Sequence, residues 1–340
     1  AASGNTDAMM MGGHIPPSGT TATNEWTAPS VFGKQVDGQL FFNSTSNAFK
    51  VTEFDIPGAT WASGGALNTA KGYAAGAGTS NSAVLAIGGY STAALAEVES
   101  YNGSTWTEIA DLNTARYMRG GAGIQTAALS WGGIPATADT ESWNGSTWTE
   151  VNDLNTARYR MGGSGLYTSA VAAGGETPPG GSVTNSETWD GTNWTETSEI
   201  NTGRNGGAQS GNSNTSAIYF AGEIPGTGNQ TKAEQWDGSS WTEVGDLNTA
   251  TQRLAGAGPG NASNSALAIG GGPPNTAKTE FWNGSSWTEV ADLATAKHQL
   301  GGSGSSVSAL AFGGETPPSS LVNTTEEFTA SLSNKTITSS

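Results

Sequence analysis

Cysteine is absent from this sequence of 340 residues, which excludes a disulfide framework and thiolate chemistry. Histidine occurs twice, as His14 and His298, in unrelated positions, so we expect no histidine-based zinc site and predict neither a metal nor a cofactor. No apolar run approaches the roughly 20 residues of a membrane-spanning helix, so we predict no membrane span. Apolar residues never recur at helical spacing, which disfavours a helical fold.

Charged residues are also scarce, at 12% of the chain, about half the usual share. The net charge is −16 and the few basic residues are scattered, so the surface would repel phosphate backbones and we predict no nucleic-acid partner. Glycine and tryptophan are abundant instead, with 50 and 12 residues. Because disordered chains are poor in aromatic residues, the tryptophans indicate packed units. The sequence begins with Ala1 rather than Met, so we expect a processed or truncated start.

One tryptophan recurs every 42 to 47 residues along most of the chain. A leucine or isoleucine follows six positions later, and then comes Asn-Thr-Ala-Arg or a close variant. A period in the forties is typical of propellers and solenoids. The recurring tryptophans, which we predict to be the structural core of the repeat, are Trp61, Trp106, Trp148, Trp194, Trp241 and Trp287.

Each repeat contains signals for four short strands. A Gly/Ala run such as 120–124 predicts a strand at a crowded inner position. An apolar run such as 127–131, which ends at a glycine pair, predicts a second strand that is buried on both faces. The third strand carries Glu141 and Trp143, and an Asn-Gly turn separates it from the fourth strand, which begins at Trp148. Asn-Gly and Asp-Gly predict tight hairpins because both central residues tolerate positive φ. The predicted fold class is therefore all-β.

A single four-stranded unit exposes two apolar faces and cannot bury them alone. Packing such units around an axis buries both faces, which is the β-propeller arrangement. The recurring tryptophan is then expected to fill the space between neighbouring blades.

These features together resemble kelch repeats. The glycine pair after an apolar strand, the aromatic residue five positions before the repeat tryptophan, and the period support this resemblance over about residues 58–330. Two departures are visible: the usual tyrosine before the hairpin occurs only as Tyr101, and the fourth copy reads Ala221-Gly222 in place of the glycine pair.

Counting the apolar strand with its glycines gives six copies, so we predict six blades, with seven as the alternative. The strand at Trp61 has no preceding unit and the last unit lacks a tryptophan strand, so joining the two chain ends would close the ring without a free edge. The predicted organisation is 1–38 as part of a seventh blade or the remnant of a preceding propeller, 39–57 as a β-hairpin connector, and 58–340 as the propeller.

The residue types and their positions give little support for a catalytic function. Galactose oxidase is a kelch enzyme, but its copper site uses a cysteine that this chain lacks. The stretch 142–148 resembles the Asp-box of sialidase propellers, which would imply an arginine clamp on a carboxylate. However, Arg116, Arg158 and Arg204 occupy one equivalent repeat position, and glutamates such as Glu141 obey the repeat too. We therefore predict that they anchor loops, with calcium binding by the carboxylates as the alternative.

The loops between the second and third strands vary in length and sequence while the framework repeats. By antiparallel geometry they emerge on the same face as the loops between blades, and rigid scaffolds commonly carry recognition surfaces in this way. The alternative is length variation without function. The candidate binding residues on this face are Tyr117, Arg119, Tyr159, Arg160, Arg253 and His298.

Three functions remain open. Low charge, near-identical repeats and the connector GQLFFNSTSNAFK resemble virion proteins of marine bacteriophages, which implies a non-enzymatic tail-fibre, appendage or capsid-surface protein. Its expected location is the virion surface or extracellular space, and its expected partners are other virion proteins, a host surface glycan or receptor, and further copies of itself. The alternatives are a cellular or secreted kelch adaptor with a protein partner and a sialidase-like enzyme acting on glycans.

Overall fold

The computed structural model describes residues 14–15, 18–19, 37–43, 45–258 and 262–337, and it divides the chain into two units. The larger unit is Asp55–Ser331, and the smaller unit combines Ala1–Phe54 with Leu332–Ser340. The described residues of both units contain β-strands and a single short 3-10 helix, η1 (Ala262–Asn264), so the all-β prediction is confirmed.

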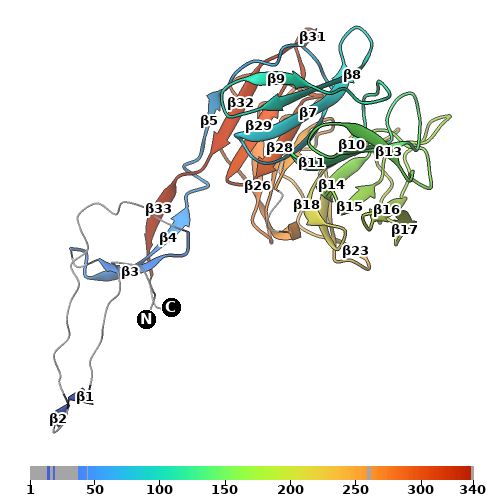
Figure 1. The fold of residues 1–340 in the computed structure, drawn as a ribbon. Coiled ribbons are helices and arrows are strands. Elements are labelled where there is room, and N and C mark those ends of the chain that lie inside the picture. The colour runs from blue at the N-terminus through green and yellow to red at the C-terminus, as the bar shows by residue number, and fades with distance from the viewer. Residues whose placement is uncertain (1–13, 16–17, 20–36, 44, 259–261, 338–340) are drawn as a thin grey trace. The chain divides into compact units, whose positions relative to one another are not determined.

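The larger unit contains six four-stranded antiparallel sheets among its described residues, and we refer to them as blades 1 to 6 (Figure 1). The strands of the first three blades follow the chain in order. Blade 1 has β6 (Ala75–Ser80), β7 (Ala83–Tyr90), β8 (Ala94–Tyr101) and β9 (Trp106–Ile109). Blade 2 has β10 (Gly120–Ile124), β11 (Ala127–Trp131), β12 (Thr140–Trp143) and β13 (Trp148–Val151). Blade 3 has β14 (Gly162–Leu166), β15 (Ser169–Ala173), β16 (Ser186–Trp189) and β17 (Trp194–Glu196).

Blades 4 and 6 carry an additional small hairpin in the loop between their second and third strands. Blade 4 has β18 (Ala208–Ser213), β19 (Ser216–Phe220), β22 (Ala233–Trp236) and β23 (Trp241–Glu243), with the hairpin β20 (Glu223–Ile224) and β21 (Gly228–Asn229). Blade 5 has β24 (Ala255–Ala257), β25 (Ala266–Ile269), β26 (Thr279–Trp282) and β27 (Trp287–Glu289). Blade 6 has β28 (Gly301–Ser305), β29 (Ser308–Phe312) and β32 (Thr325–Thr329), with the hairpin β30 (Glu315–Thr316) and β31 (Ser320–Leu321).

The fourth strand of blade 6 comes from the beginning of the unit. Strand β5 (Thr60–Ser63) pairs antiparallel with β32, and Trp61 lies opposite Phe328. The first strand of each blade contacts the first strand of the next, and β28 of blade 6 contacts β6 of blade 1. The sheets therefore surround an axis as a closed β-propeller, and the predicted joining of an early and a late strand is confirmed. The seventh blade considered for residues 1–38 lies almost entirely outside the described residues.

The hairpin between the third and fourth strands differs from the predicted two-residue turn. Trp143 pairs with Trp148, so four residues form the loop, and only Gly145 has a positive φ, of 95°. The Asn144 side chain explains the difference, because its Oδ1 accepts hydrogen bonds from the backbone amides of Ser146 and Thr147, both at 2.9 Å. An Asn or Asp at this position thus stabilises the loop through its side-chain oxygen.

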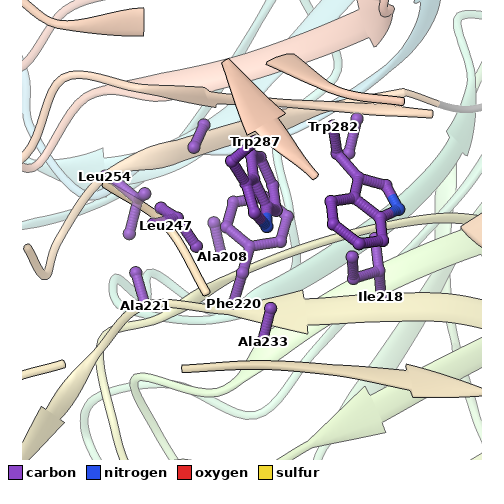
Figure 2. Close-up of a cluster of buried hydrophobic side chains, with 11 residues drawn as sticks. Ala208, Ile218, Phe220, Ala221, Ala233, Leu247, Leu254, Trp282 and Trp287 are labelled. Atoms are coloured by element: carbon purple, nitrogen blue, oxygen red, sulfur yellow. The ribbon is translucent and has the colours of Figure 1, made fainter. Parts of the chain in front are cut away.

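The recurring tryptophans pack between blades. Five of the six are buried, and Trp61 is partly exposed. Trp287 of blade 5 lies against Phe220 of blade 4, with ring centroids 4.9 Å apart, and Figure 2 shows both rings in one apolar cluster with Leu247 and Leu254. Trp194 contacts Trp131 of the preceding blade in the same way, at 5.0 Å. The predicted inter-blade role is therefore confirmed at these positions.

The indole N–H of this tryptophan donates to a hydroxyl at the start of the third strand of the preceding blade. The four pairs are Trp106 with Thr325, Trp194 with Thr140, Trp241 with Ser186 and Trp61 with Thr279, at 2.9 to 3.2 Å. The indole nitrogens of Trp148 and Trp287 are buried and have no hydrogen-bond partner among the described residues. The equivalent third-strand residues there are Val98 and Ala233, which have no hydroxyl, so the sequence difference accounts for both cases.

We predict that Ala233→Ser stabilises the protein by about 0.5–1.5 kcal/mol, the net value of one hydrogen bond, because it supplies an acceptor to the buried Trp287 indole. At the equivalent position of blade 3, the Ser186 hydroxyl accepts a hydrogen bond from the Trp241 indole, so a serine can make this contact in the repeat. Urea denaturation of both proteins measures the change. The matched control is the same substitution with Trp287→Phe, which has no N–H; an equal gain in that background would contradict the explanation.

The smaller unit contains a three-stranded antiparallel sheet. Strand β4 (Ala48–Phe54) lies between β3 (Leu40–Asn43) and β33 (Leu332–Thr336). The hairpin predicted for residues 39–57 is thus present, but the C-terminal strand, which we expected within the propeller range 58–340, completes this sheet instead. Strand β33 pairs with β4 from Leu332 to Thr336 and forms an edge of this sheet. Strands β1 (His14–Ile15) and β2 (Ser18–Gly19) pair only with each other in the part of the chain described.

Candidate functional site

The repeated glutamates of the third strands anchor the loops that lead into their blades. Glu187 Oε2 accepts hydrogen bonds from the backbone and side-chain nitrogens of Asn155, at 2.7 and 2.9 Å. Its Oε1 pairs with Arg158 Nη2 at 2.8 Å, and both side chains are fully buried. The equivalent pairs are Lys71 with Glu99, Arg116 with Glu141, Arg204 with Glu234, and Lys297 with Glu326. These carboxylates and cations therefore hold the framework together, as predicted.

In blade 5, the repeated glutamate anchors the entering loop without a lysine or arginine. Thr251 occupies the position of the arginine or lysine, and the two oxygens of Glu280 accept from the backbone amides of Asn248 and Thr249, at 2.8 and 2.9 Å. A second amide thus replaces the missing ion pair.

The loops between blades and the loops within blades meet on one face of the propeller. Isolated antiparallel bridges join Tyr117 to Ile134, Tyr159 to Glu176 and His298 to Glu315. In each pair, one residue lies just before the first strand of a blade, and the other lies just after the second strand of the same blade. The predicted face with both sets of loops is therefore present.

At the centre of this face, six residues form a closed ring of backbone hydrogen bonds, which we call the axial ring. One residue comes from the entry to each blade, and its amide donates to the carbonyl of its predecessor around the axis at 2.6 to 3.4 Å. All six have left-handed backbones with φ between 53° and 64°, although five are not glycine. The members are Tyr73, Met118, Arg160, Gly206, Arg253 and Gln299.

The left-handed conformation is costly for side chains other than glycine, at roughly 1–2 kcal/mol per residue. Closure of the ring makes it necessary, because each peptide must present its N–H to one neighbour and its C=O to the other. Backbone strain of this kind clusters at functional sites in proteins. Because of this strained ring, we place the candidate site on the propeller axis.

The axial ring surrounds an open hollow with a cavity volume of about 110 Å³, which we call the axial hollow. Its lining consists of the six ring residues and the residue that follows each of them. Small-molecule sites in proteins have volumes of roughly 300–1,000 Å³, so the axial hollow is smaller than a usual ligand pocket. Further along the axis, the inner strands line a second hollow, largely with glycine.

The structure separates the six predicted binding residues into three groups. Arg160 and Arg253 belong to the axial ring and line the axial hollow. Tyr117, Tyr159 and His298 each precede a ring residue and form the bridges between the two sets of loops. Arg119 follows a ring residue, and its side chain is buried rather than displayed on the surface.

The position of Arg119 explains why it is not a surface residue. Met161, Leu254 and Leu300 occupy the same repeat position and are buried, so this position fills space between blades. The Arg119 guanidinium lies against Gly88 of blade 1, where an added Cβ would be 1.7 Å from Nη2. None of its three nitrogens has a hydrogen-bond partner among the described residues. Burial, reinforced by repulsion from Arg116, lowers the pKa of Arg119 to about 9.

Three members of the axial ring with large side chains were not predicted from the sequence: Tyr73, Met118 and Gln299. They hold the same position, two residues before the inner strand of their blade, and aligning the repeats on the glycine run reveals it. The residue types differ so strongly at this position that periodicity alone gave no signal.

Side chains from different blades influence one another electrostatically. Burial raises the pKa of the Tyr73 phenol, while Arg253 and Arg160 act in the opposite direction. Burial lowers the pKa of His298, and Arg253 adds to this effect while Glu315 opposes it. Tyr73 also packs against Tyr117, with ring centroids 6.0 Å apart. Aromatic and cationic groups from several blades thus face one small space.

Arg160 is partly neutralised and Arg253 is not. Arg160 Nη1 lies 3.3 Å from Glu176 Oε2, and its Nε lies 3.3 Å from the Met118 sulfur. The Arg253 guanidinium makes no hydrogen bond or ion pair within the described ranges, and its Nε is buried. Two arginines, one of them paired, thus lie on the axis of a protein with a net charge of −16.

Two further observations concern the described residues as a whole. They contain no group of three or more His, Asp or Glu side chains placed to hold a metal ion. Helices long and apolar enough to cross a membrane are likewise not found among them.

Comparison with known proteins identifies the fold and leaves the family open. No protein-family model matches the sequence, and no curated protein matches it significantly. Among solved structures, the fold is similar to that of the protein YjhT, with a TM-score of 0.65 and 14% sequence identity. The match covers 79% of this chain and 99% of YjhT. At this identity the likeness establishes the architecture alone: by strand pairing, by closure around the axis and by this likeness, the chain is a β-propeller.

Proposed function

We propose that this chain is a non-enzymatic structural or appendage protein of a bacteriophage virion. In this proposal the face with both sets of loops attaches to glycans of the host surface or to neighbouring virion proteins. The chain would then be located on the virion surface or outside the cell. The resemblance to phage virion proteins in composition and repeat pattern motivates the virion assignment.

The observation that carries the proposal is the contrast between a regular framework and irregular loops on one face. The framework repeats the same buried glutamate anchor in all six blades. The loops between second and third strands range from residues 91–93 in blade 1 to residues 174–185 in blade 3. Rigid scaffolds with variable loops at one end are a common architecture for recognition.

The use of the carboxylates supports a binding role over catalysis. Most glycosidases use two carboxylates that are free to act on the glycosidic bond, whereas sialidases use a tyrosine as the nucleophile. The six repeated glutamates are instead buried and engaged by loop amides, and five of them also pair with a cation. A sialidase-like activity is the weakest of the three functions, because Arg116, Arg158 and Arg204 are buried in these ion pairs and are not free to hold a substrate carboxylate. A cellular or secreted adaptor with a protein partner remains the second candidate, because the same loop face suits a protein surface.

Immunogold labelling of intact phage particles tests the proposal. Antibody raised against the purified chain is expected to label the tail tip, the fibres or the capsid exterior of a phage that encodes it. The same antibody after adsorption with purified chain is the control and should give no label. Particles without label would overturn the virion assignment, and a pull-down with the purified chain as bait would then test the adaptor.

A further inference from the structure

We infer that the three-stranded sheet of the smaller unit binds the same sheet of a second copy of this chain. The contact surface is one face of the sheet, built from alternate residues of β3, β4 and β33 and from the residue after β33. We call it the apolar face, and its apolar members are Leu40, Phe42, Phe49, Val51 and Ile337. This surface lies outside the propeller, so the inference does not depend on the proposed function.

The register of the sheet places these five side chains on one side. Phe42 lies opposite Phe49, and Leu40 lies opposite Val51. The Ile337 amide donates to the Phe49 carbonyl at 3.0 Å, which extends the pairing of β33 with β4 by one residue. Residues that lie opposite each other in an antiparallel ladder share a face of the sheet. The rings of Phe42 and Phe49 are accordingly in contact, with centroids 5.3 Å apart.

The apolar face is exposed, although its composition is that of a buried one. Leu40 is 65% exposed, Phe42 42%, Phe49 56% and Ile337 48%. Among the described residues, only three other large apolar side chains are exposed, and they lie at hairpins of blades 2 and 3. An antiparallel sheet with one solvated face normally carries polar residues there. A cluster of exposed apolar side chains on one face therefore indicates an interaction surface.

The distribution of charge favours a second copy as the partner. In the described part of the smaller unit, Asp37 and Glu53 offset Lys50 and Lys335, whereas the whole chain carries a net charge of −16. Two copies can therefore meet at this sheet without the repulsion that other surfaces of so acidic a chain would produce. Glu53 and Lys335 lie on the same side as the apolar residues and pair with each other at 3.1 Å. Covering the face thus leaves neither charge without a partner.

A two-fold axis parallel to β4 makes the apolar face complementary to itself. Rotation about this axis keeps each cross-strand row opposite the same row of the second copy and exchanges the sides of β3 and β33. Phe49 then meets Phe49 of the second copy, and Phe42 meets Ile337 of the second copy. The row of three apolar residues is thereby covered by an apolar row, in the aligned packing that is common for two sheets.

The size of the apolar face limits the expected affinity. A fully covered aromatic side chain buries roughly 150–250 Å², so the four exposed residues offer on the order of 400 Å² per copy. With their flanking residues, two copies would bury about 1,000 Å², the lower limit for a specific interface. We therefore expect a reversible dimer with a dissociation constant on the order of 10 µM.

Sedimentation velocity of the full chain tests the inference over concentrations from roughly 1 to 200 µM. We expect a reversible shift from the monomer mass of 34.4 kDa towards twice that mass. Phe49→Lys and, separately, Phe49→Glu should each weaken dimerisation about ten-fold or more, because like charges would face each other across the two-fold axis. An equimolar mixture of the two variants should restore the dimer, because opposite charges then meet at this position.

Two further variants separate this contact from a general effect of added charge or lost fold. Ile337→Lys lies after the last strand, so it should weaken dimerisation about ten-fold without unfolding the sheet. Leu166→Lys, at the exposed end of β14 in blade 3, should change dimerisation by less than about two-fold. A chain that stays monomeric over the whole range would overturn the inference. So would a dimer that Phe49→Lys leaves intact, an equal loss in Leu166→Lys, or a mixture of the Phe49 variants that fails to associate.

Discussion

Replacing Trp194 with alanine should lower the free energy of unfolding by about 3–5 kcal/mol, the usual cost of truncating a buried tryptophan. Trp194 is 5% exposed and lies between blades 2 and 3. Its ring centroid is 5.0 Å from that of Trp131 and 5.5 Å from that of Trp189. Truncation would open a cavity between two rigid sheets that cannot collapse without breaking their own ladders.

A hydrogen bond adds to this loss. The Trp194 indole donates to Thr140 Oγ1 at 3.1 Å, so the alanine variant also removes a buried partner. Trp194→Phe should therefore fall between the parent protein and the alanine variant. Urea denaturation followed by circular dichroism measures all three proteins. Tyr167→Ala, at an exposed turn, is the control and should cost far less. Equal losses at Trp194 and Tyr167 would contradict the inter-blade role.

Replacing Arg158 with alanine should cost about 3–5 kcal/mol, because it breaks a buried ion pair and leaves a carboxylate without its cation. Arg158 and Glu187 are fully buried, and their atoms Nη2 and Oε1 lie 2.8 Å apart. Arg158 Nη1 also donates to the carbonyls of Gly174 and Asn185, each at 2.8 Å. The variant therefore leaves one buried charge without its cation and the Gly174 carbonyl without its donor, while the Asn185 carbonyl still accepts from the Gly174 amide at 2.9 Å.

Neutralising the remaining carboxylate should recover part of this loss. Glu187→Gln in the Arg158→Ala background removes the buried charge, while the amide oxygen can still accept from Asn155. The double variant should thus be more stable than Arg158→Ala alone. Lys278→Ala is the control, because its exposed pair with Glu289 is worth only about 0–1 kcal/mol. If Arg158→Ala costs no more than Lys278→Ala, the anchors do not stabilise the framework as described.

The regular parts of this protein follow from local sequence. The run at residues 120–124 and the apolar run at residues 127–131 form β10 and β11 with the predicted bounds. Their small and apolar residues repeat with one period, so one local pattern specifies every blade and the tryptophan that seals it to its neighbour. The unpaired strand at Trp61 also predicted how the ring closes, because an edge strand needs a partner.

The axial site depended on tertiary structure. Arg119, Arg160 and Arg253 look alike in the sequence, yet the structure buries the first between blades and places the other two on the axis. A shift of one residue along a strand entry turns a side chain from the hollow into the inter-blade space, and no local propensity records that shift. The left-handed axial ring arises only when six blades close upon one another, since each of its hydrogen bonds joins residues from different blades. Strand β33 likewise pairs with β4, which is distant from it in the sequence. Local chemistry therefore determined the blades, and closure of the chain determined which side chains meet at the axis.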